Sequence, residues 1–270
     1  MAQQLMFRSF GSPSVEDKQG ADWGEDLVNT VASKTITHLF SESESVQVAI
    51  RCQPSSKLLQ GIVDNFKVSG KGLVIRQYFR TAEMWFETDA VSLDFSAILS
   101  GKISLRQPTQ AIAQVTLLEA DINKSFQAPL VKQRLENLTT ESLLALSGGE
   151  PVSFQNVRVR LQADSQIEIF AEAVLPNGVF PVALSCTIAV ERRRRMRFQN
   201  PQFLSANIPE SQQGISQLLS TVLGEILDQM VDLDKFNLDG VTLRINRLET
   251  QGEKLIFSGY AEIARIPNNP

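Results

Sequence analysis

His38 is the residue with the most general catalytic potential, and it is the only histidine among the 270 residues. Nucleophilic catalysis of the Ser/His/Asp or Cys/His type needs an imidazole beside the nucleophile. His38 falls among apolar residues of an expected helix, and no cluster of His, Cys, Asp and Glu has the spacing of metal ligands. The sequence therefore predicts a structural or surface role for His38, and it predicts no catalytic residue, no cofactor site and no metal site.

Three further features with chemical potential have simpler explanations. Cys52 and Cys186 lie far apart and outside any CxxC spacing, so reduced, buried thiols are expected rather than a disulfide or a zinc site. Glu119 and Asp121 are the nearest carboxylate pair for acid–base catalysis, but capping of a following helix explains them more simply. Gly70-Lys71-Gly72 lacks the rest of a P-loop and predicts a hairpin turn.

The densest charge cluster is a run of arginines. Five arginines occur within six positions: Arg192, Arg193, Arg194, Arg195 and Arg197. The alternation of the preceding apolar strand would place Arg192 and Arg194 on the buried face of a sheet, and unpaired guanidinium groups are too costly to bury. The strand must therefore leave the core there. A solvated loop is one interpretation. Contact with lipid headgroups or an anionic membrane is the other, because arginine binds phosphate oxygens in a bidentate manner.

Residues 211–232 are expected to form the longest helix, because apolar residues recur there at offsets of three and four. We predict that the broad apolar face of this helix lines a lipid-binding groove. The residues predicted to contact lipid are Ile215, Leu218, Leu219, Val222, Leu223, Ile226 and Met230. The polar face contains no Lys or Arg, unlike that of a helix lying on an anionic membrane. Packing against a sheet alone is the alternative interpretation of the apolar face.

The rest of the chain alternates blocks of strands with helices. In order, the expected elements are a helix (23–40), a strand block (46–117), short helices (121–147), a second strand block (152–198), the long helix, and a hairpin that turns at Gln251-Gly252. Strand blocks that are interrupted by helices, without regular βαβ units, predict an α+β fold with antiparallel sheet. Residues 1–20 lack apolar periodicity and are expected to be a mobile tail, so that residues 21–267 form a single domain.

Composition limits the classes of function. The formal net charge of −4 and the pI near 5.3 provide no general positive field, so nucleic acid is not expected as a partner. Hydrophobic residues make up 43% of the chain, which is enough for a large core. The N-terminus lacks the apolar stretch of a signal peptide, and no run approaches the about 18 apolar residues of a membrane span. A cytoplasmic protein is therefore predicted, with peripheral contact at a membrane surface as an open alternative.

Two stretches resemble a known family. LQGIVDNFKVSGKGLVIR (residues 59–76) and LDFSAILSGKISLRQPTQAIAQVTLLEADIN (residues 93–123) resemble the LmeA-like phospholipid-binding family of bacteria. The most specific part is the passage from a strand into a helix at residues 115–123. The resemblance implies a curved antiparallel sheet wrapped around a long helix, in an elongated architecture similar to tubular lipid-binding (TULIP-like) folds. It also implies an apolar groove and phospholipid binding.

We therefore predict non-enzymatic binding of a phospholipid or a similar amphiphile in an apolar groove, with transfer or presentation of the lipid as its use. Each methylene group gains about 0.8 kcal/mol on leaving water, so an apolar channel needs no chemistry to hold an acyl chain. The alternative is an assembly module that binds a protein partner through a strand edge or a helix face, which a tightly filled interior would favour. A hydrolase of lipid-like substrates would need polar groups that converge deep in the pocket.

Overall fold

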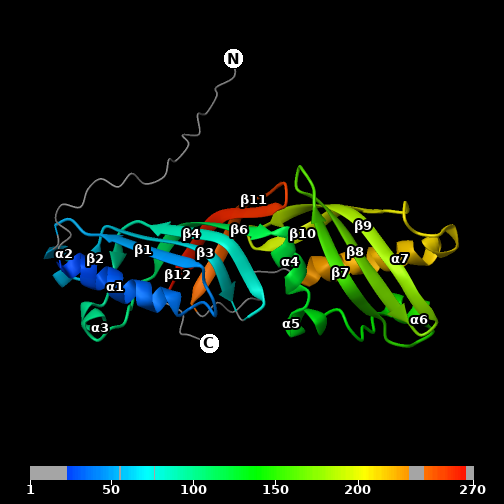
Figure 1. The fold of residues 1–270 in the computed structure, drawn as a ribbon, viewed down its shortest axis with the longest axis horizontal. Helices are drawn as coiled ribbons and strands as arrows, with labels where there is room; N and C mark the ends of the chain where they lie inside the picture. The colour runs from blue at the N-terminus through cyan, green and yellow to red at the C-terminus, as the bar shows by residue number, and fades with distance from the viewer. Residues whose placement is uncertain (1–22, 55, 76, 231–239, 266–270) are drawn as a thin grey trace, which may run out of the picture.

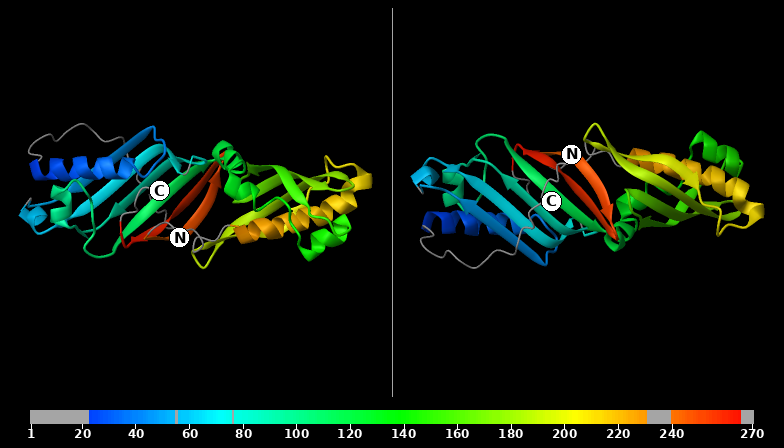
Figure 2. Two further views of the ribbon diagram at one scale, coloured as in Figure 1. Left: turned by 90° about the horizontal axis from the view of Figure 1, so that it is seen from below. Right: turned by 90° about the horizontal axis from the view of Figure 1, so that it is seen from above.

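The structure is a computed structural model that describes residues 23–54, 56–75, 77–230 and 240–265. The described chain forms an elongated molecule with two larger antiparallel sheets, one towards each end (Figure 1). A long helix packs against each of these sheets, and the sheets meet near the middle of the molecule (Figure 2). This arrangement creates two main hydrophobic cores and a junction between them.

The first part of the chain and its last hairpin together build a six-stranded sheet. In spatial order its strands are β1 (Ser45–Arg51), β3 (Asn65–Ile75), β4 (Phe79–Thr88), β6 (Thr109–Leu118), β12 (Lys254–Ile263) and β11 (Val241–Gln251). All neighbouring strands are antiparallel. Helix α1 (Trp23–Thr37) packs Val28, Ala32 and Ile36 into a core that includes Phe66 and Val68 of β3. Alternate residues of β3 are buried from Phe66 to Gly72, as the two-residue period of a strand requires. The prediction of a hairpin turn at Gly70-Lys71-Gly72 is wrong, because these residues lie inside β3, where Gly70 and Lys71 pair with both β1 and β4.

Small elements close the far end of the six-stranded sheet. They are α2 (Ser56–Leu59), β2 (Ile62–Val63), β5 (Val91–Ser92) and α3 (Phe95–Leu99). Strands β2 and β5 pair with each other, and the Leu93 N–H donates to the Gly61 carbonyl (2.6 Å), so α2 and α3 are held at the same end of the molecule. Asp94 caps α3 by accepting from the backbone N–H groups of Ser96 and Ala97.

The second sheet has four strands. In spatial order they are β10 (Arg195–Phe203), β9 (Gly178–Glu191), β8 (Gln166–Leu175) and β7 (Ser153–Leu161). Helix α7 (Glu210–Met230) lies against this sheet, and its buried Leu219, Leu223 and Leu227 pack with Ile169 and Leu184. The three leucines recur at a spacing of four residues, which keeps them on one face of the helix. Helix α6 (Glu141–Ser147) adds Leu143 to the same core.

The two sheets share a junction. There α4 (Glu119–Ser125) follows β6 directly, and α5 (Pro129–Lys132) follows α4. Leu255 of β12 is buried in the core of the four-stranded sheet, and Leu117 and Phe257 pack against that core. The Ser165 N–H, in the turn between β7 and β8, donates to Thr250 Oγ1 of β11 (2.9 Å). Shared apolar packing and hydrogen bonds therefore join the sheets.

This architecture confirms the predicted α+β fold with antiparallel sheet. The helices expected over residues 23–40 and 211–232 are α1 and α7, with ends that differ by three residues or fewer. Both larger sheets are open, and α7 lies against one of them, so a single curved sheet wrapped around a long helix is not confirmed. The tail expected over residues 1–20 lies outside the described residues, and a single domain over residues 21–267 stays a prediction.

Candidate functional site

A cavity of about 360 Å³ lies at the junction of the two sheets. Strands of both sheets, helices α4 and α5, and the end of α7 surround it. The lining residues are Phe79, Arg80, Thr81, Leu117, Asp121, Ile122, Ser125, Phe126, Leu130, Val131, Arg134, Val159, Leu161, Ile167, Ile169, Ile188, Met196, Phe198, Leu227, Met230, Leu255 and Phe257. Of these 22 residues 17 are apolar, so the cavity presents mainly hydrocarbon to its contents.

One wall of the cavity follows from the alternation of β7 and β8. Val159 and Leu161 in β7, and Ile167 and Ile169 in β8, are all buried, whereas Arg160 between the first two is exposed. Successive side chains of a strand point to opposite faces of the sheet. One face of this hairpin therefore supplies four branched apolar side chains to the cavity.

Helix α4 is fixed beside the cavity by two side chains that bind the free edge of β7. Among the described residues, strand β7 is the last in its sheet, so its outer backbone groups face no further described strand. The Asn123 amide donates to the Val159 carbonyl (2.9 Å) and accepts from the Val159 N–H (2.7 Å), and Glu119 Oε2 accepts from the Leu161 N–H (2.8 Å). Glu119 and Asn123 are four residues apart, which corresponds to a rise of about 6 Å along a helix. Val159 and Leu161 are two residues apart, which corresponds to about 6.7 Å along a strand, so the two spacings match.

Arg80, at the start of β4, ties α4 to the six-stranded sheet. Its Nη1 donates to Asp121 Oδ2 (2.7 Å), and its Nη2 donates to Glu44 Oε1 (2.6 Å). These hydrogen bonds raise the pKa of Arg80, and the one to Glu44 has the larger effect. The prediction that Asp121 caps a helix is wrong, because Leu118 occupies the N-cap position and the Asp121 carboxylate binds Arg80.

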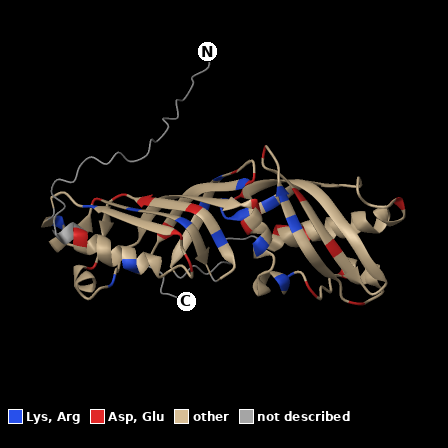
Figure 3. Ribbon diagram, viewed as in Figure 1, with Lys and Arg blue, Asp and Glu red and all other residues tan. Residues whose placement is uncertain are grey.

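The cavity opens to solvent where α5 follows α4. Leu130 and Arg134 line the cavity and are exposed, Leu130 to 47%, whereas Ile169 on the sheet wall is fully buried. The cavity therefore has a closed apolar end on the four-stranded sheet and a solvent-facing end that carries charged groups. Lys and Arg residues lie in this middle part of the molecule together with Asp and Glu residues (Figure 3).

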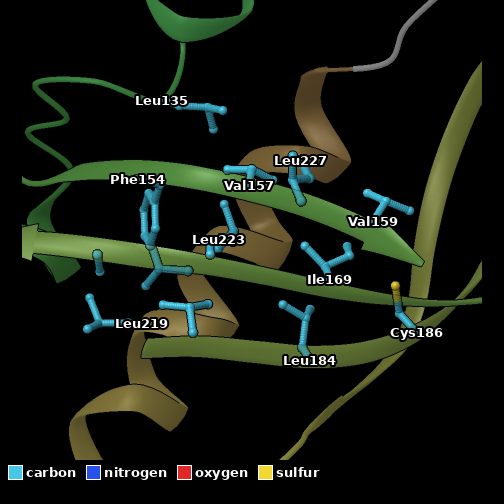
Figure 4. Packing of buried hydrophobic residues seen from close by; sticks show 14 of the residues in the cluster. Leu135, Phe154, Val157, Val159, Ile169, Leu184, Cys186, Leu219, Leu223 and Leu227 are labelled. Carbon is cyan, nitrogen blue, oxygen red and sulfur yellow. The ribbon is translucent and has the colours of Figure 1, made fainter. Parts of the chain in front are cut away.

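The residues of α7 that were predicted to contact lipid occupy three kinds of position. Met230 lines the cavity, together with Leu227, which the prediction left out. Leu219, Val222 and Leu223 are buried in the core of the four-stranded sheet, and Ile215 and Ile226 are partly buried against it. Leu218 is 53% exposed. Figure 4 shows Leu219, Leu223 and Leu227 among the side chains of the strands, at successive turns of the helix. Only the C-terminal turn of α7 reaches the junction.

The arginine run forms the turn between β9 and β10. Strand β9 ends at Glu191, and Arg192 and Arg193 have left-handed backbones, with φ of 50° and 62°. The side chains of residues 192–194 are exposed, as expected from the cost of burying guanidinium groups. The turn also touches the other sheet, because the Arg193 carbonyl accepts from the Ile245 N–H (2.7 Å).

The last members of the run are engaged in ion pairs. Arg197 Nη1 lies 3.0 Å from Asp228 Oδ2 of α7 and 3.9 Å from Glu191 Oε2, and Arg195 Nη1 also lies 3.9 Å from Glu191. Asp228 Oδ1 additionally accepts from the Phe198 N–H (2.9 Å). Arg197 therefore helps to fix α7 against the edge strand β10, next to the cavity residues Met196 and Phe198.

His38 and Cys186, the other residues with chemical potential, do not line the cavity. His38 is exposed at the end of α1, and its Nδ1 donates to the Lys34 carbonyl (2.6 Å). Cys186 is buried in the core, where desolvation first and the charge of Asp228 second raise its pKa to about 12, so its thiol stays protonated. Within the described ranges, no group of three or more His, Cys, Asp and Glu residues could hold a metal ion.

Comparison with known protein families identifies the family of this chain. A family model described as LmeA-like phospholipid-binding matches residues 20–259, which include the strands and helices around the cavity. The chain belongs to this family. No curated protein matches it. Among the described helices of this LmeA-like protein, none is long and apolar enough to cross a membrane. The family description links the protein to phospholipid.

Sequence reasoning missed most of the residues that form the cavity of this LmeA-like protein. The alternation of β7 and β8 indicated that Val159 and Ile169 face inward, but it carried no signal for a space beside them. Ile122, Phe126 and Leu130 recur at the spacing of one helix face, which predicted a helix kinked or divided at Pro129. This pattern carried no signal that Leu130 and Arg134 line a cavity.

Proposed function

We propose that this LmeA-like protein binds a phospholipid, or a similar amphiphile, by enclosing an acyl chain in the cavity at the junction of its sheets. The lining carries the proposal: 17 of its 22 residues are apolar, and the polar ones include Arg80, Asp121 and Arg134. An apolar cavity with a few charged groups towards its opening is the arrangement that an amphiphile requires.

The size of the cavity suits one acyl chain rather than a whole diacyl lipid. A dry cavity of about 150 Å³ holds a benzene ring, so the cavity of about 360 Å³ accommodates roughly a dozen carbon atoms. At about 0.8 kcal/mol per methylene, such a chain gains on the order of 10 kcal/mol on leaving water. Association costs about 4–15 kcal/mol, so contacts to the rest of the lipid must contribute to the affinity.

We place the lipid headgroup next to Arg134. The Arg134 side chain is exposed at the opening and forms no ion pair with the described residues. Arg80, in contrast, is already bound by Glu44 and Asp121. A guanidinium group without a carboxylate partner is available for bidentate hydrogen bonds to phosphate oxygens.

The arginine turn is proposed as a second contact for anionic headgroups, apart from the opening. Arg192 and Arg193 are exposed on this turn. Arg197 is paired with Asp228, and this pairing neutralises much of its charge. The attraction is therefore expected to come mainly from Arg192 and Arg193, and less from Arg197.

The proposed activity is binding, with transfer or presentation of the lipid and without covalent chemistry. The polar lining groups have structural roles that support this view: Ser125 Oγ donates to the Ile122 carbonyl (2.6 Å), and Asp121 binds Arg80. The continuous apolar cavity favours lipid binding over the assembly module, which a filled interior would have supported. The proposal includes an elongated apolar site like that of tubular lipid-binding folds. A cytoplasmic location and peripheral membrane association stay predictions.

The test uses three proteins: the parent and two variants with a tryptophan in α7. Each is purified gently and extracted with organic solvent, and mass spectrometry measures the amount of lipid in each extract. Met230→Trp places an indole in the cavity, and Leu218→Trp adds the same group at an exposed position of the same helix. We expect stoichiometric phospholipid with the parent and with Leu218→Trp, and a clear loss with Met230→Trp at an unchanged thermal melt. Repeated absence of any amphiphile from the folded parent would overturn the proposal and favour the assembly module.

A further inference from the structure

The opening of the cavity is surrounded by exposed apolar side chains. Leu130, Ile75 and Tyr78 are exposed to 47%, 40% and 36%. Leu130 lines the cavity itself, and Ile75 lies directly opposite the lining residue Phe79 in the pairing of β3 with β4. Because directly paired residues share a face of the sheet, Ile75 extends the apolar surface of the cavity outward at the end of this hairpin. Tyr78 precedes Phe79 in the same turn.

Basic side chains lie beside these apolar ones. Between Ile122 and Leu135 the chain contains Lys124, Lys132 and Arg134 and no Asp or Glu. All three basic side chains are exposed, and none forms an ion pair with a described residue. Of the acidic residues that flank this segment, Asp121 is bound by Arg80 and Glu119 accepts from the Leu161 N–H, whereas Glu136 follows Leu135. The segment that covers the cavity is therefore positively charged on its outer surface.

We propose that this surface docks on a phospholipid bilayer that contains anionic lipid, with the cavity opening towards the bilayer. The surface, here called the mouth rim, consists of Ile75, Tyr78, Lys124, Leu130, Lys132 and Arg134. Tyrosine suits the interface between a bilayer and water, since it combines an apolar ring with a polar end. The apolar side chains of leucine and isoleucine suit the acyl side of that interface. Lysine and arginine add attraction to anionic headgroups.

A bilayer is a better match for the mouth rim than a folded protein. A stable protein interface buries roughly 1,200–2,000 Å² in total and has a well-packed apolar centre. The mouth rim offers three separate exposed apolar side chains around an opening, which is too little for such a centre. Interfacial binding to lipid needs only a small apolar area combined with positive charge. This inference rests on the proposed function, because a lipid enters the cavity directly only if the opening meets the bilayer.

Two variant pairs separate the mouth rim from other exposed surfaces. Ile75→Ser with Tyr78→Ser removes apolar groups of the rim, and its control is Leu59→Ser with Leu99→Ser. The control leucines, exposed to 69% and 64%, lie on α2 and α3 at the end of the molecule away from α4 and α5 (Figure 1).

The second pair of variants removes the same number of positive charges from the rim and from another exposed surface. Lys124→Ser with Lys132→Ser removes two charges from the rim, and Lys71→Ser with Lys102→Ser removes two exposed charges elsewhere. Each protein is tested for cosedimentation with vesicles of phosphatidylcholine alone and with added phosphatidylglycerol. Each is also titrated with a fluorescent short-chain phosphatidylcholine below its micelle concentration, which measures filling of the cavity without a bilayer.

We expect each rim variant to bind the anionic vesicles about tenfold more weakly than the parent, with less than a threefold change for each control. Uptake of the monomeric lipid should be unchanged, because none of the four substituted rim residues lines the cavity. Vesicle binding that is equal in rim variants and parent, or lost only in the controls, would overturn the docking surface. Equal binding of the parent to neutral and anionic vesicles would overturn its charge selectivity. Failure of the parent to take up monomeric lipid would overturn the proposed function instead, while the vesicle measurements still decide the docking surface.

Discussion

The side chain of Asn123 takes the place of a neighbouring strand for Val159. Its Nδ2 donates to the Val159 carbonyl (2.9 Å), and its Oδ1 accepts from the Val159 N–H (2.7 Å). Both backbone groups of one edge residue are thus satisfied by one amide, 36 residues away in the sequence. This contact joins α4, which covers the cavity, to the strand that forms the cavity wall.

Asn123→Ala should therefore destabilise the protein and loosen α4. Two backbone groups lose their partners, and we expect the free energy of unfolding to fall by about 1–3 kcal/mol. Urea denaturation measures this loss, and hydrogen exchange should show faster exchange of the Val159 amide. The exposed neighbour Lys124→Ala is the control, with no resolved change. Equal stability of both variants would show that water replaces the amide at no cost.

The core residues of α7 should affect stability more than its exposed apolar residue. Leu219 is fully buried, and Leu219→Ala should lower the free energy of unfolding by about 2–5 kcal/mol. Leu218→Ala removes the same atoms from a side chain that is 53% exposed and should cost less than about 1 kcal/mol. Thermal and urea melts of the two variants provide the comparison. Similar losses would contradict the placement of this helix face.

The two carboxylates that bind Arg80 should contribute unequally. The Asp121 side chain is 11% exposed and that of Glu44 is 64% exposed, so solvent screens the second ion pair much more. We expect Asp121→Asn to lower the free energy of unfolding by about 1–2 kcal/mol and Glu44→Gln by less than about 0.5 kcal/mol. Measurements in low and high salt should show the larger salt dependence for the pair with Glu44. A larger loss for Glu44→Gln would refute this ranking.

The buried thiol of Cys186 should make stability depend on alkaline pH. Its pKa rises from 9.0 to about 12 in the folded protein, chiefly through desolvation. Above pH 9 the unfolded chain loses a proton that the folded chain keeps, so stability falls as pH rises from about 9 towards 12, by up to roughly 1.4 kcal/mol per pH unit.

Cys186→Ala removes this titration. The variant should be less stable at neutral pH because of the smaller side chain, yet the difference from the parent should shrink as pH rises above about 9. Urea denaturation of parent and variant between pH 7 and 10.5 measures the difference. Parallel curves for the two proteins would contradict the raised pKa.

The arginine turn should attract anionic membranes in a salt-dependent manner. Arg192→Asn with Arg193→Asn removes two exposed charges, and asparagine tolerates the left-handed backbone at both positions. We expect a severalfold loss of cosedimentation with anionic vesicles, since each arginine contributes at most about 1 kcal/mol before screening. The thermal melt should not change.

Arg197→Ser provides the contrast to that double variant. It leaves Asp228, whose side chain is 16% exposed, without its closest cationic partner, so a lower melting temperature is expected from this change. If the double asparagine variant binds anionic vesicles as strongly as the parent at low ionic strength, the arginine turn is not a contact for the membrane.

The sequence by itself determined that α7 is a helix and which side chains of β7 face inward. The apolar period of α7 and the alternation of Val157, Val159 and Leu161 in β7 are properties of one segment, and they predicted the helix and the buried strand face correctly. The arginine run likewise indicated where β9 must leave the core, because the cost of burying guanidinium groups does not depend on the rest of the fold.

Only the tertiary structure decided where the cavity lies and which residues surround it. The same apolar face of α7 contributes Leu219 to a filled core and Met230 to the cavity, because only its last turn reaches the junction of the sheets. Asp121 suggested a helix cap, yet its carboxylate binds Arg80, 41 residues earlier in the chain. Periodicity records which face of an element is buried. It does not record how two distant elements approach each other, and the space that remains between them depends on that approach.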